Sequence, residues 1–240
     1  MAKRAVLTLI FYLVFLATFI FGGLLILVMM IFGIPRRKAS AAVSKRWAKM
    51  LLSIAGIKVH LKGAENLGFS GPKILAANHQ GNFDIPILMS ALPVNFRFLV
   101  KKELFSIPVF GWHLRNRGDI PINRKSPASA SYTIKMLAKD LKDGDPLLIF
   151  PEGTRSADGK VAEFKRGSVV LASESGARIV PIGISGSFSI QKKGGVMIYP
   201  TDVYVNIGTP IGNEADPDDI SGFSTRLREK VISLIEDYKR

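Results

Sequence analysis

The chain has 240 residues, which allows one domain of ordinary size and an appended segment. It contains no cysteine, and this excludes disulfide bonds, thiolate metal sites and any acyl-cysteine intermediate. Its formal net charge of +14 indicates a surface that attracts anions, such as acidic lipid headgroups, phosphorylated substrates or nucleic acid.

The first element along the chain is an apolar run from Ala5 to Ile34 without a charged residue. As a helix it is about 45 Å long, more than the ~30 Å that a bilayer core needs. Two geometries fit: one tilted span, or a break at Gly22-Gly23 into two helices that enter one leaflet and return. We expect residues 1–38 to form a membrane-embedded helical segment. Its more basic C-terminal side should face the cytoplasm at the inner membrane.

Residues 39–56 predict a basic amphipathic helix that ends at Gly56. Two interpretations fit: the helix lies in the lipid headgroup layer with Trp47 as an anchor, or it packs on the globular domain. Basic residues follow directly after the apolar run, which suits a membrane surface better than nucleic acid. They are Arg36, Arg37, Lys38, Lys45, Arg46 and Lys49. The last three lie on the helix opposite an apolar face of Val43, Trp47, Met50, Leu51 and Ile54.

Short β-branched or apolar runs alternate with helical patterns from residue 57 onward. This alternation predicts an α/β fold over residues 57–240, with a mixed, largely parallel sheet flanked by helices. The predicted strands are residues 57–61, 73–77, 96–101, 119–123, 146–150, 178–184, 196–199 and 203–207. The predicted helices are residues 84–92, 127–141, 165–175 and a last one from about residue 217 or 221 to 238.

Several common catalytic motifs are absent from the sequence. It has no G-x-S-x-G serine elbow, no G-x-x-x-x-G-K-[ST] or G-x-G-x-x-G phosphate loop and no H-E-x-x-H zinc motif. The chain has only three histidines, His60, His79 and His113, which are too few for a histidine-rich metal site. We therefore expect neither a resident metal nor a bound cofactor.

The segment most informative about chemistry is Asn-His-Gln-Gly-Asn-Phe-Asp at residues 78–84, which follows an apolar strand and opens a helix. Asp84 lies five residues after His79, across a turn that contains Gly81. Such a turn lets the carboxylate fix the imidazole tautomer while His79 takes a proton from an alcohol. Taken alone, the pattern also fits a plain turn histidine followed by an aspartate that caps a helix.

Three further sequence elements favour the catalytic interpretation of His79 and Asp84 over the helix-capping one. Phe-Pro-Glu-Gly-Thr-Arg-Ser at 150–156 also follows an apolar strand and combines a carboxylate, a glycine and an arginine suited to forked phosphate contacts. Gly-Asp-Ile-Pro-Ile-Asn-Arg at 118–124 ends a strand with another arginine. Ile-Val-Pro-Ile-Gly-Ile at 179–184 is the fourth, and by itself it fits a buried strand with a proline at the edge.

These four elements, in this order and spacing, resemble the glycerolipid acyltransferase family, most closely its bacterial 1-acylglycerol-3-phosphate acyltransferases. The resemblance covers residues 57–184 and implies an acyltransferase domain over 57–240. It implies His79 as the base and Asp84 as its orienting partner. It also implies substrate-binding roles for Lys101, Arg124, Glu152, Gly153 and Arg155, and a donor-side role for Pro181.

The reaction that the resemblance implies transfers an acyl chain from acyl-CoA or acyl carrier protein to the free sn-2 hydroxyl of lysophosphatidate, giving phosphatidate. We expect backbone N–H groups just after His79 to stabilise the oxyanion. The expected apolar groove residues are Ile85, Leu88, Phe105, Val109, Phe110 and Trp112.

Other interpretations stay open at this stage. The same chemistry could act on glycerol 3-phosphate, another lysophospholipid or an acyl-amino-acid lipid. A different class is a non-catalytic, membrane-anchored module that binds nucleic acid or acidic lipid. Such a module has no use for Glu152 beside the arginines, because a carboxylate repels phosphate.

Overall fold

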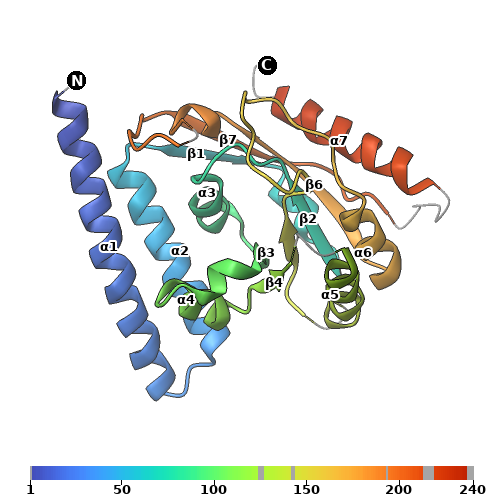
Figure 1. Cartoon of the computed structure of the whole chain (residues 1–240), viewed down its shortest axis with the longest axis horizontal. Coiled ribbons are helices and arrows are strands. Elements are labelled where there is room, and N and C mark those ends of the chain that lie inside the picture. Colours follow the sequence, from blue (N-terminus) through green and yellow to red (C-terminus); the bar gives the residue numbers. More distant parts are fainter. Residues whose placement is uncertain (1, 124–126, 142–143, 193, 213–218, 237–240) are drawn as a thin grey trace.

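The computed structural model describes residues 2–123, 127–141, 144–192, 194–212 and 219–236 and shows an α/β fold (Figure 1). The described residues form a seven-stranded sheet in the order β1-β7-β6-β2-β5-β3-β4, in which only β6 and β7 pair antiparallel. The predicted fold class is therefore confirmed. The strands are β1 Lys58–Lys62, β2 Lys73–Ala77, β3 Arg97–Lys101, β4 Ile120–Ile122, β5 Leu147–Ile149, β6 Arg178–Ser185 and β7 Asp202–Ile207.

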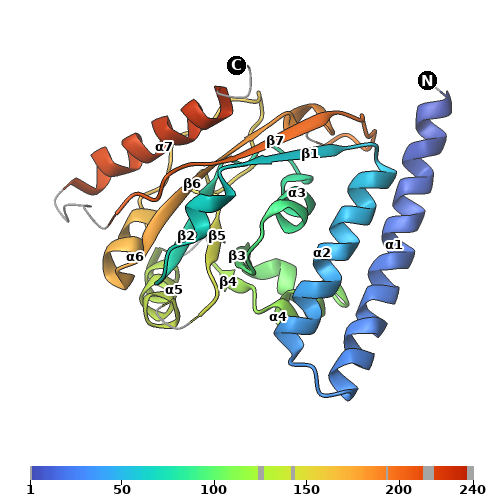
Figure 2. The same cartoon turned by 180° about the vertical axis from the view of Figure 1, so that it is seen from behind.

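Helices cover both faces of this sheet, as the two opposite views show (Figures 1 and 2). The central strand β2 explains why, because its alternate side chains enter different cores: Leu75 and Ala77 on one side, Ile74 and Ala76 on the other. Helices α2 and α3 pack on the first core and α5, α6 and α7 on the second. The helices are α1 Ala2–Ile31, α2 Arg36–Ile54, α3 Asp84–Ala91, α4 Phe110–Arg117, α5 Pro127–Asp140, α6 Gly167–Ser175 and α7 Ile220–Glu236.

The N-terminal segment forms one long helix, α1, that is apolar and long enough to cross a membrane by length and composition. The helix runs unbroken through Gly22 and Gly23, so a break at these glycines is wrong. Both glycines are instead points of close approach: a Cβ on Gly22 would lie 3.3 Å from Val43 of α2, and one on Gly23 would lie 3.3 Å from His113 of α4. The chain reverses later, at Gly33, which has φ +80°.

Helix α2 returns antiparallel to α1 and packs against it and the α/β part (Figure 1). The indole N–H of Trp47 donates to Thr18 Oγ1 of α1 at 3.1 Å, and its ring lies 5.3 Å from that of Phe15. Trp47 therefore contacts α1, and its partly buried ring also packs against the first core. Met50 and Ile54, from the same predicted apolar face, remain exposed.

One local prediction is wrong, and one helix was not predicted. Residues 196–199 form no strand, because their backbone groups are bonded to α1: Ile198 N–H donates to Thr8 Oγ1, and Val196 O accepts from the Tyr12 hydroxyl. The helix α4 was not predicted, since eight residues give too little periodicity and Gly111 interrupts them. That glycine is required, because a Cβ there would lie 2.1 Å from the Phe105 carbonyl oxygen.

Candidate active site

Parallel strands bring the predicted site residues to one edge of the sheet. Strands β2, β5, β3 and β4 are neighbours and all run in the same direction, so their carboxyl ends meet. His79 follows β2, Glu152 follows β5, and Lys101 ends β3. Arg124 comes just after β4 in the sequence and lies outside the described residues.

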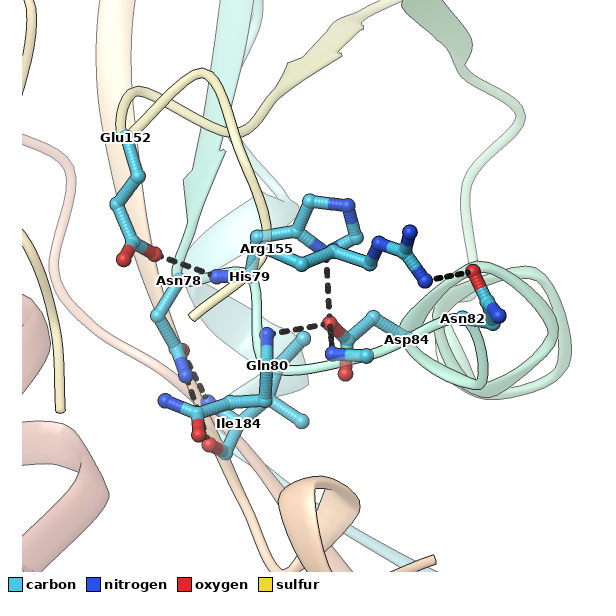
Figure 3. A network of polar contacts seen from close by, with 9 residues as sticks. Asn78, His79, Gln80, Asn82, Asp84, Glu152, Arg155 and Ile184 are labelled. Atoms are coloured by element: carbon cyan, nitrogen blue, oxygen red, sulfur yellow. Dashed lines mark hydrogen bonds and ion pairs between the residues drawn. The ribbon is translucent and has the colours of Figure 1, made fainter. Parts of the chain in front are cut away.

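The imidazole of His79 is held by Asp84, as the sequence predicted (Figure 3). The Nδ1 atom lies 2.8 Å from Asp84 Oδ2, and the aspartate side chain is completely buried. A carboxylate only accepts hydrogen bonds, so Nδ1 carries the proton and Nε2 is the free basic nitrogen. The imidazole ring also stacks on Phe150 with centroids 4.0 Å apart. His79 is therefore fixed in the tautomer that a general base needs.

The same carboxylate shapes the turn before α3. Asp84 Oδ2 accepts the N–H groups of Gln80 at 2.7 Å and Gly81 at 2.8 Å. The expectation that backbone N–H groups just after His79 hold an oxyanion fails for these two groups, because Asp84 already occupies them. Their bonds instead fold the turn so that the carboxylate reaches the imidazole.

The backbone around His79 is anchored to two neighbouring strands. The side chain of Asn78 bonds Ile184 of β6 twice, accepting its N–H at 2.7 Å and donating to its carbonyl at 3.0 Å. Glu152 Oε1 accepts the N–H of His79 at 2.6 Å, and Oε2 accepts the N–H of Ala162 at 2.9 Å. Burial raises the pKa of the Glu152 carboxyl, while the two N–H groups oppose that rise.

Both oxygens of Glu152 thus serve the protein backbone rather than pointing to open space. This arrangement predicts a large effect of Glu152→Gln, because an amide accepts at only one end and its NH₂ would face a backbone donor. We expect about 1–3 kcal/mol lower unfolding free energy and reduced turnover. Thermal unfolding and initial rates measure both, with the exposed Glu174→Gln on α6 as control. Unchanged stability and turnover would contradict this positioning role.

Cationic side chains flank the histidine. Lys101 is half exposed and lies 3.6 Å from Glu103, and Arg155 Nη1 donates to Asn82 Oδ1 at 2.8 Å (Figure 3). Gly153, with φ +72°, lets the chain turn between Glu152 and Arg155. A Cβ on Gly153 would lie 2.8 Å from Lys165 Nζ, so this lysine packs against the turn, although it does not line the cavity described next.

His79 lines a large, mainly apolar cavity of about 840 Å³. Lys101, Gly153 and Arg155 also line it, and α1 contributes a row of aromatic rings from Phe11, Phe15 and Phe19. The part of the cavity lined by His79, Lys101 and Arg155, named its mouth, is polar, whereas most of the remaining wall is apolar. This combination suits a ligand with a charged head and a hydrocarbon chain.

The predicted groove residues are only partly correct. Ile85 and Phe110 line the cavity, whereas Leu88 is fully buried behind it. The other three predicted groove residues, Phe105, Val109 and Trp112, are not among its lining residues. The aromatic wall from α1 was missed, because an apolar membrane-type helix gives no sign of which face closes a pocket. Pro181 lies buried within the interior strand β6 rather than at an edge, and it does not line the cavity.

Comparison with known proteins shows the family to which the chain belongs. A family model described as Acyltransferase matches residues 58–185, more than half of the chain. The chain belongs to the acyltransferase family. The match covers β1 to β6, and so includes the strand ends that carry the dyad and Glu152.

Relatives within the acyltransferase family share one description. The chain is 36% identical over 203 residues to the chloroplastic 1-acyl-sn-glycerol-3-phosphate acyltransferase of Arabidopsis thaliana, covering 80% of this chain and 56% of the relative. It is 31% identical over 222 residues to the 1-acyl-sn-glycerol-3-phosphate acyltransferase of Pseudomonas aeruginosa, covering 89% and 83%. The chain thus spans just over half the length of the plant relative.

A solved acyltransferase has the same fold throughout. The crystal structure of the 1-acyl-sn-glycerophosphate (LPA) acyltransferase from Thermotoga maritima matches with a TM-score of 0.85 at 26% sequence identity. The match covers 99% of this chain and 97% of that chain, so α1 and α2 are included with the sheet.

Proposed function

We propose that this acyltransferase transfers an acyl chain from an acyl thioester to the sn-2 hydroxyl of lysophosphatidate, producing phosphatidate for phospholipid biosynthesis. The observation that carries the proposal is the buried Asp84–His79 pair at the mouth of an 840 Å³ apolar cavity that Lys101 and Arg155 also line. The relatives from Arabidopsis, Pseudomonas and Thermotoga, all named as acyltransferases of 1-acyl-sn-glycerol 3-phosphate, support the same acceptor.

The steps of the reaction follow from the geometry. His79 Nε2 removes the proton of the acceptor hydroxyl as its oxygen attacks the thioester carbonyl. The tetrahedral intermediate collapses, the C–S bond breaks, and the imidazolium returns the proton to the leaving thiolate of coenzyme A or acyl carrier protein. Asp84 stabilises the imidazolium throughout. General-base catalysis of this type contributes about 10²–10⁴ in rate.

Charge at the cavity mouth favours a phosphomonoester on the acceptor. Lys101, Arg155 and, by the family resemblance, Arg124 provide cations that match a dianion with several acceptor oxygens. A choline headgroup brings a cation that these residues disfavour. An acceptor that already carries an acyl chain also gains from the apolar cavity, which glycerol 3-phosphate cannot fill.

An acceptor panel tests the proposal. Purified protein and one acyl thioester are incubated separately with lysophosphatidate, glycerol 3-phosphate, lysophosphatidylcholine and an acyl-amino-acid lipid. We expect the highest kcat/KM with lysophosphatidate. A higher value with lysophosphatidylcholine would overturn the acceptor assignment, and binding of acidic lipid without acyl transfer to any acceptor would favour a non-catalytic module.

Loss of the arginines should affect the acceptor selectively. We expect Arg124→Ala and Arg155→Ala each to raise the apparent KM for lysophosphatidate about 10- to 100-fold, because each removes charge-assisted hydrogen bonds worth about 1.5–3 kcal/mol. The KM for the donor should change much less. Arg226→Ala, which removes an exposed arginine of α7 that pairs with Asp219 and does not line the cavity, is the control. Variants that weaken only donor binding would contradict these roles.

We propose that the protein is held on the cytoplasmic face of the cell membrane by the exposed side of α1. Leu13, Leu24 and other large apolar side chains point outward along the helix. The opposite side packs on the α/β part at separate points along the helix, through Tyr12 and Gly23. A helix attached in this way could span the bilayer only if it drew the α/β part into the lipid, so embedding in one leaflet fits better than a span.

A basic hollow of about 550 Å³ supports the same orientation. Arg36, Arg37, Lys102 and Arg115 line it where α2 begins, directly after the apolar helix. None of these four forms an ion pair with a carboxylate among the described residues. Such a cluster attracts the anionic headgroups of a cytoplasmic leaflet. The proposed division of the chain into residues 1–38, 39–56 and 57–240 stays a prediction. Helices α1 and α2 both form part of the wall of the cavity, together with the α/β part.

Cell fractionation tests this location. We expect the full-length chain to sediment with membranes, to resist a high-salt wash and to be released by detergent, since apolar burial rather than charge holds it. Leu13→Asp combined with Leu24→Asp should shift it toward the soluble fraction, because both side chains are exposed and leave the core intact. Recovery of the unaltered chain in the soluble fraction without detergent would contradict the proposal.

A further inference from the structure

A chain of hydrogen bonds links Arg155 to the long apolar helix α1. Arg155 Nη1 donates to Asn82 Oδ1 at 2.8 Å, and Asn82 Nδ2 donates to Gln191 Oε1 at 3.2 Å. Gln191 Nε2 then donates to the Tyr12 hydroxyl at 2.8 Å, and that hydroxyl donates to the carbonyl of Val196 at 3.0 Å. Four separate segments of the chain meet in this relay, and its four side chains all line the large cavity.

The direction of the relay is set at its arginine end. A guanidinium only donates, so Asn82 must present its oxygen to Arg155 and its NH₂ to Gln191. Gln191 must then present its oxygen to Asn82 and its NH₂ to Tyr12. The Tyr12 hydroxyl accepts that bond and keeps its own proton for Val196. All four bonds form together only in this arrangement, so the loss of one side chain removes a restraint on the orientation of the next.

Orientation matters most at Arg155, whose long side chain lies half-buried at the cavity mouth. An unrestrained arginine loses rotamer entropy when it binds a ligand, whereas one already held in place loses less. The bond from Nη1 to Asn82 uses one of the five N–H donors of the guanidinium. Holding Arg155 in this way therefore favours acceptor binding.

We propose that Asn82, Gln191 and Tyr12 are positioning residues that hold Arg155 for the acceptor phosphate. The position of Arg155 then depends on whether α1 is packed against the domain. The proposal rests on the acceptor role of Arg155 proposed above. The Tyr12 hydroxyl is a polar group on an otherwise apolar helix and forms the α1 end of the relay. It restrains Arg155 only when α1 is packed against the domain.

Tyr12→Phe and Gln191→Leu test the relay. Tyr12→Phe removes only the hydroxyl and keeps the ring that lies 5.5 Å from Phe11. We expect either variant to raise the KM for lysophosphatidate about three- to tenfold, the effect of one lost hydrogen bond, with kcat and donor KM within about twofold of the unaltered chain. The double variant should be no worse than Gln191→Leu alone, because both changes break the same chain. Tyr132→Phe, at a tyrosine 67% exposed on α5, is the matched control.

Each other outcome is decisive. If Arg155→Ala raises the acceptor KM and the two relay variants leave it within twofold, the relay is overturned and the proposed function stands. If the relay variants lower the melting temperature and change kcat and both KM values together, the contacts are merely structural and the proposal fails. If Arg155→Ala itself leaves the acceptor KM unchanged, the acceptor assignment fails and the relay falls with it.

Discussion

His79→Ala is expected to lower turnover at least about 100-fold, the range of general-base catalysis, while the protein stays folded. The reason is that His79 Nε2 is the one basic nitrogen of a histidine that lines the cavity and is oriented by a buried carboxylate. His113 also lines the cavity, but its Nε2 lies 3.2 Å from the carbonyl of Phe19, and burial lowers its pKa. Initial rates with lysophosphatidate, together with the circular dichroism of the variant, measure the effect.

The chain provides a matched control for this variant. His60 of the edge strand β1 also contacts an aspartate, with its Nε2 3.1 Å from Oδ2 of Asp202 at the start of β7, but both side chains are about half exposed. His60→Ala should leave turnover nearly unchanged. Near-normal turnover of His79→Ala, or an equal loss in His60→Ala, would show that the base has been assigned wrongly.

Asp84→Asn is expected to lower turnover by about 10²–10⁴ with a small change in melting temperature. The amide oxygen can take the place of Oδ2 and still accept the N–H groups of Gln80 and Gly81, so the turn before α3 is preserved. The negative charge is lost, however, and nothing then stabilises the imidazolium of His79 as it takes the proton. The effect should therefore appear in kcat rather than in folding.

Asp202→Asn, at the partner of His60, is the corresponding control and should have little effect on turnover. Comparing the two variants shows whether the loss of turnover is specific to the buried His79–Asp84 pair or occurs at any His–Asp pair. If Asp84→Asn unfolds the protein, the milder test is the pH dependence of kcat/KM in Asp84→Glu, which retains the charge. A variant of Asp84 that folds, lacks the charge and turns over normally would refute the role of the carboxylate.

The sequence predicted the contact between His79 and Asp84 because both residues lie in one short segment. Asp84 comes five residues after His79, across a turn that contains Gly81, so local geometry alone brings them together. The convergence of residues 78–84 and 150–156 was also predictable, since both follow parallel strands whose carboxyl ends share one edge. The resemblance to a known family gave roles to residues that such geometry leaves without one.

The cavity wall and the relay were not predictable for the opposite reason. Phe15 and Tyr12 meet the α/β part only because α1 folds back along it, a contact between segments far apart in the sequence. Glu152 was expected at the substrate, and its bonds to the N–H groups of His79 and Ala162 appear only when β2 and β5 are placed side by side. Long-range packing of this kind leaves no periodic signal in the sequence.

One measurement tests the proposed reaction most directly: purified protein in detergent is given an acyl thioester and lysophosphatidate, and phosphatidate and free thiol are quantified over time. Direct attack by the acceptor hydroxyl, with His79 as the base, predicts that the two products form in equal amounts and only when the acceptor is present. Release of thiol without phosphatidate, or no release of either product, would contradict the proposed acyl transfer.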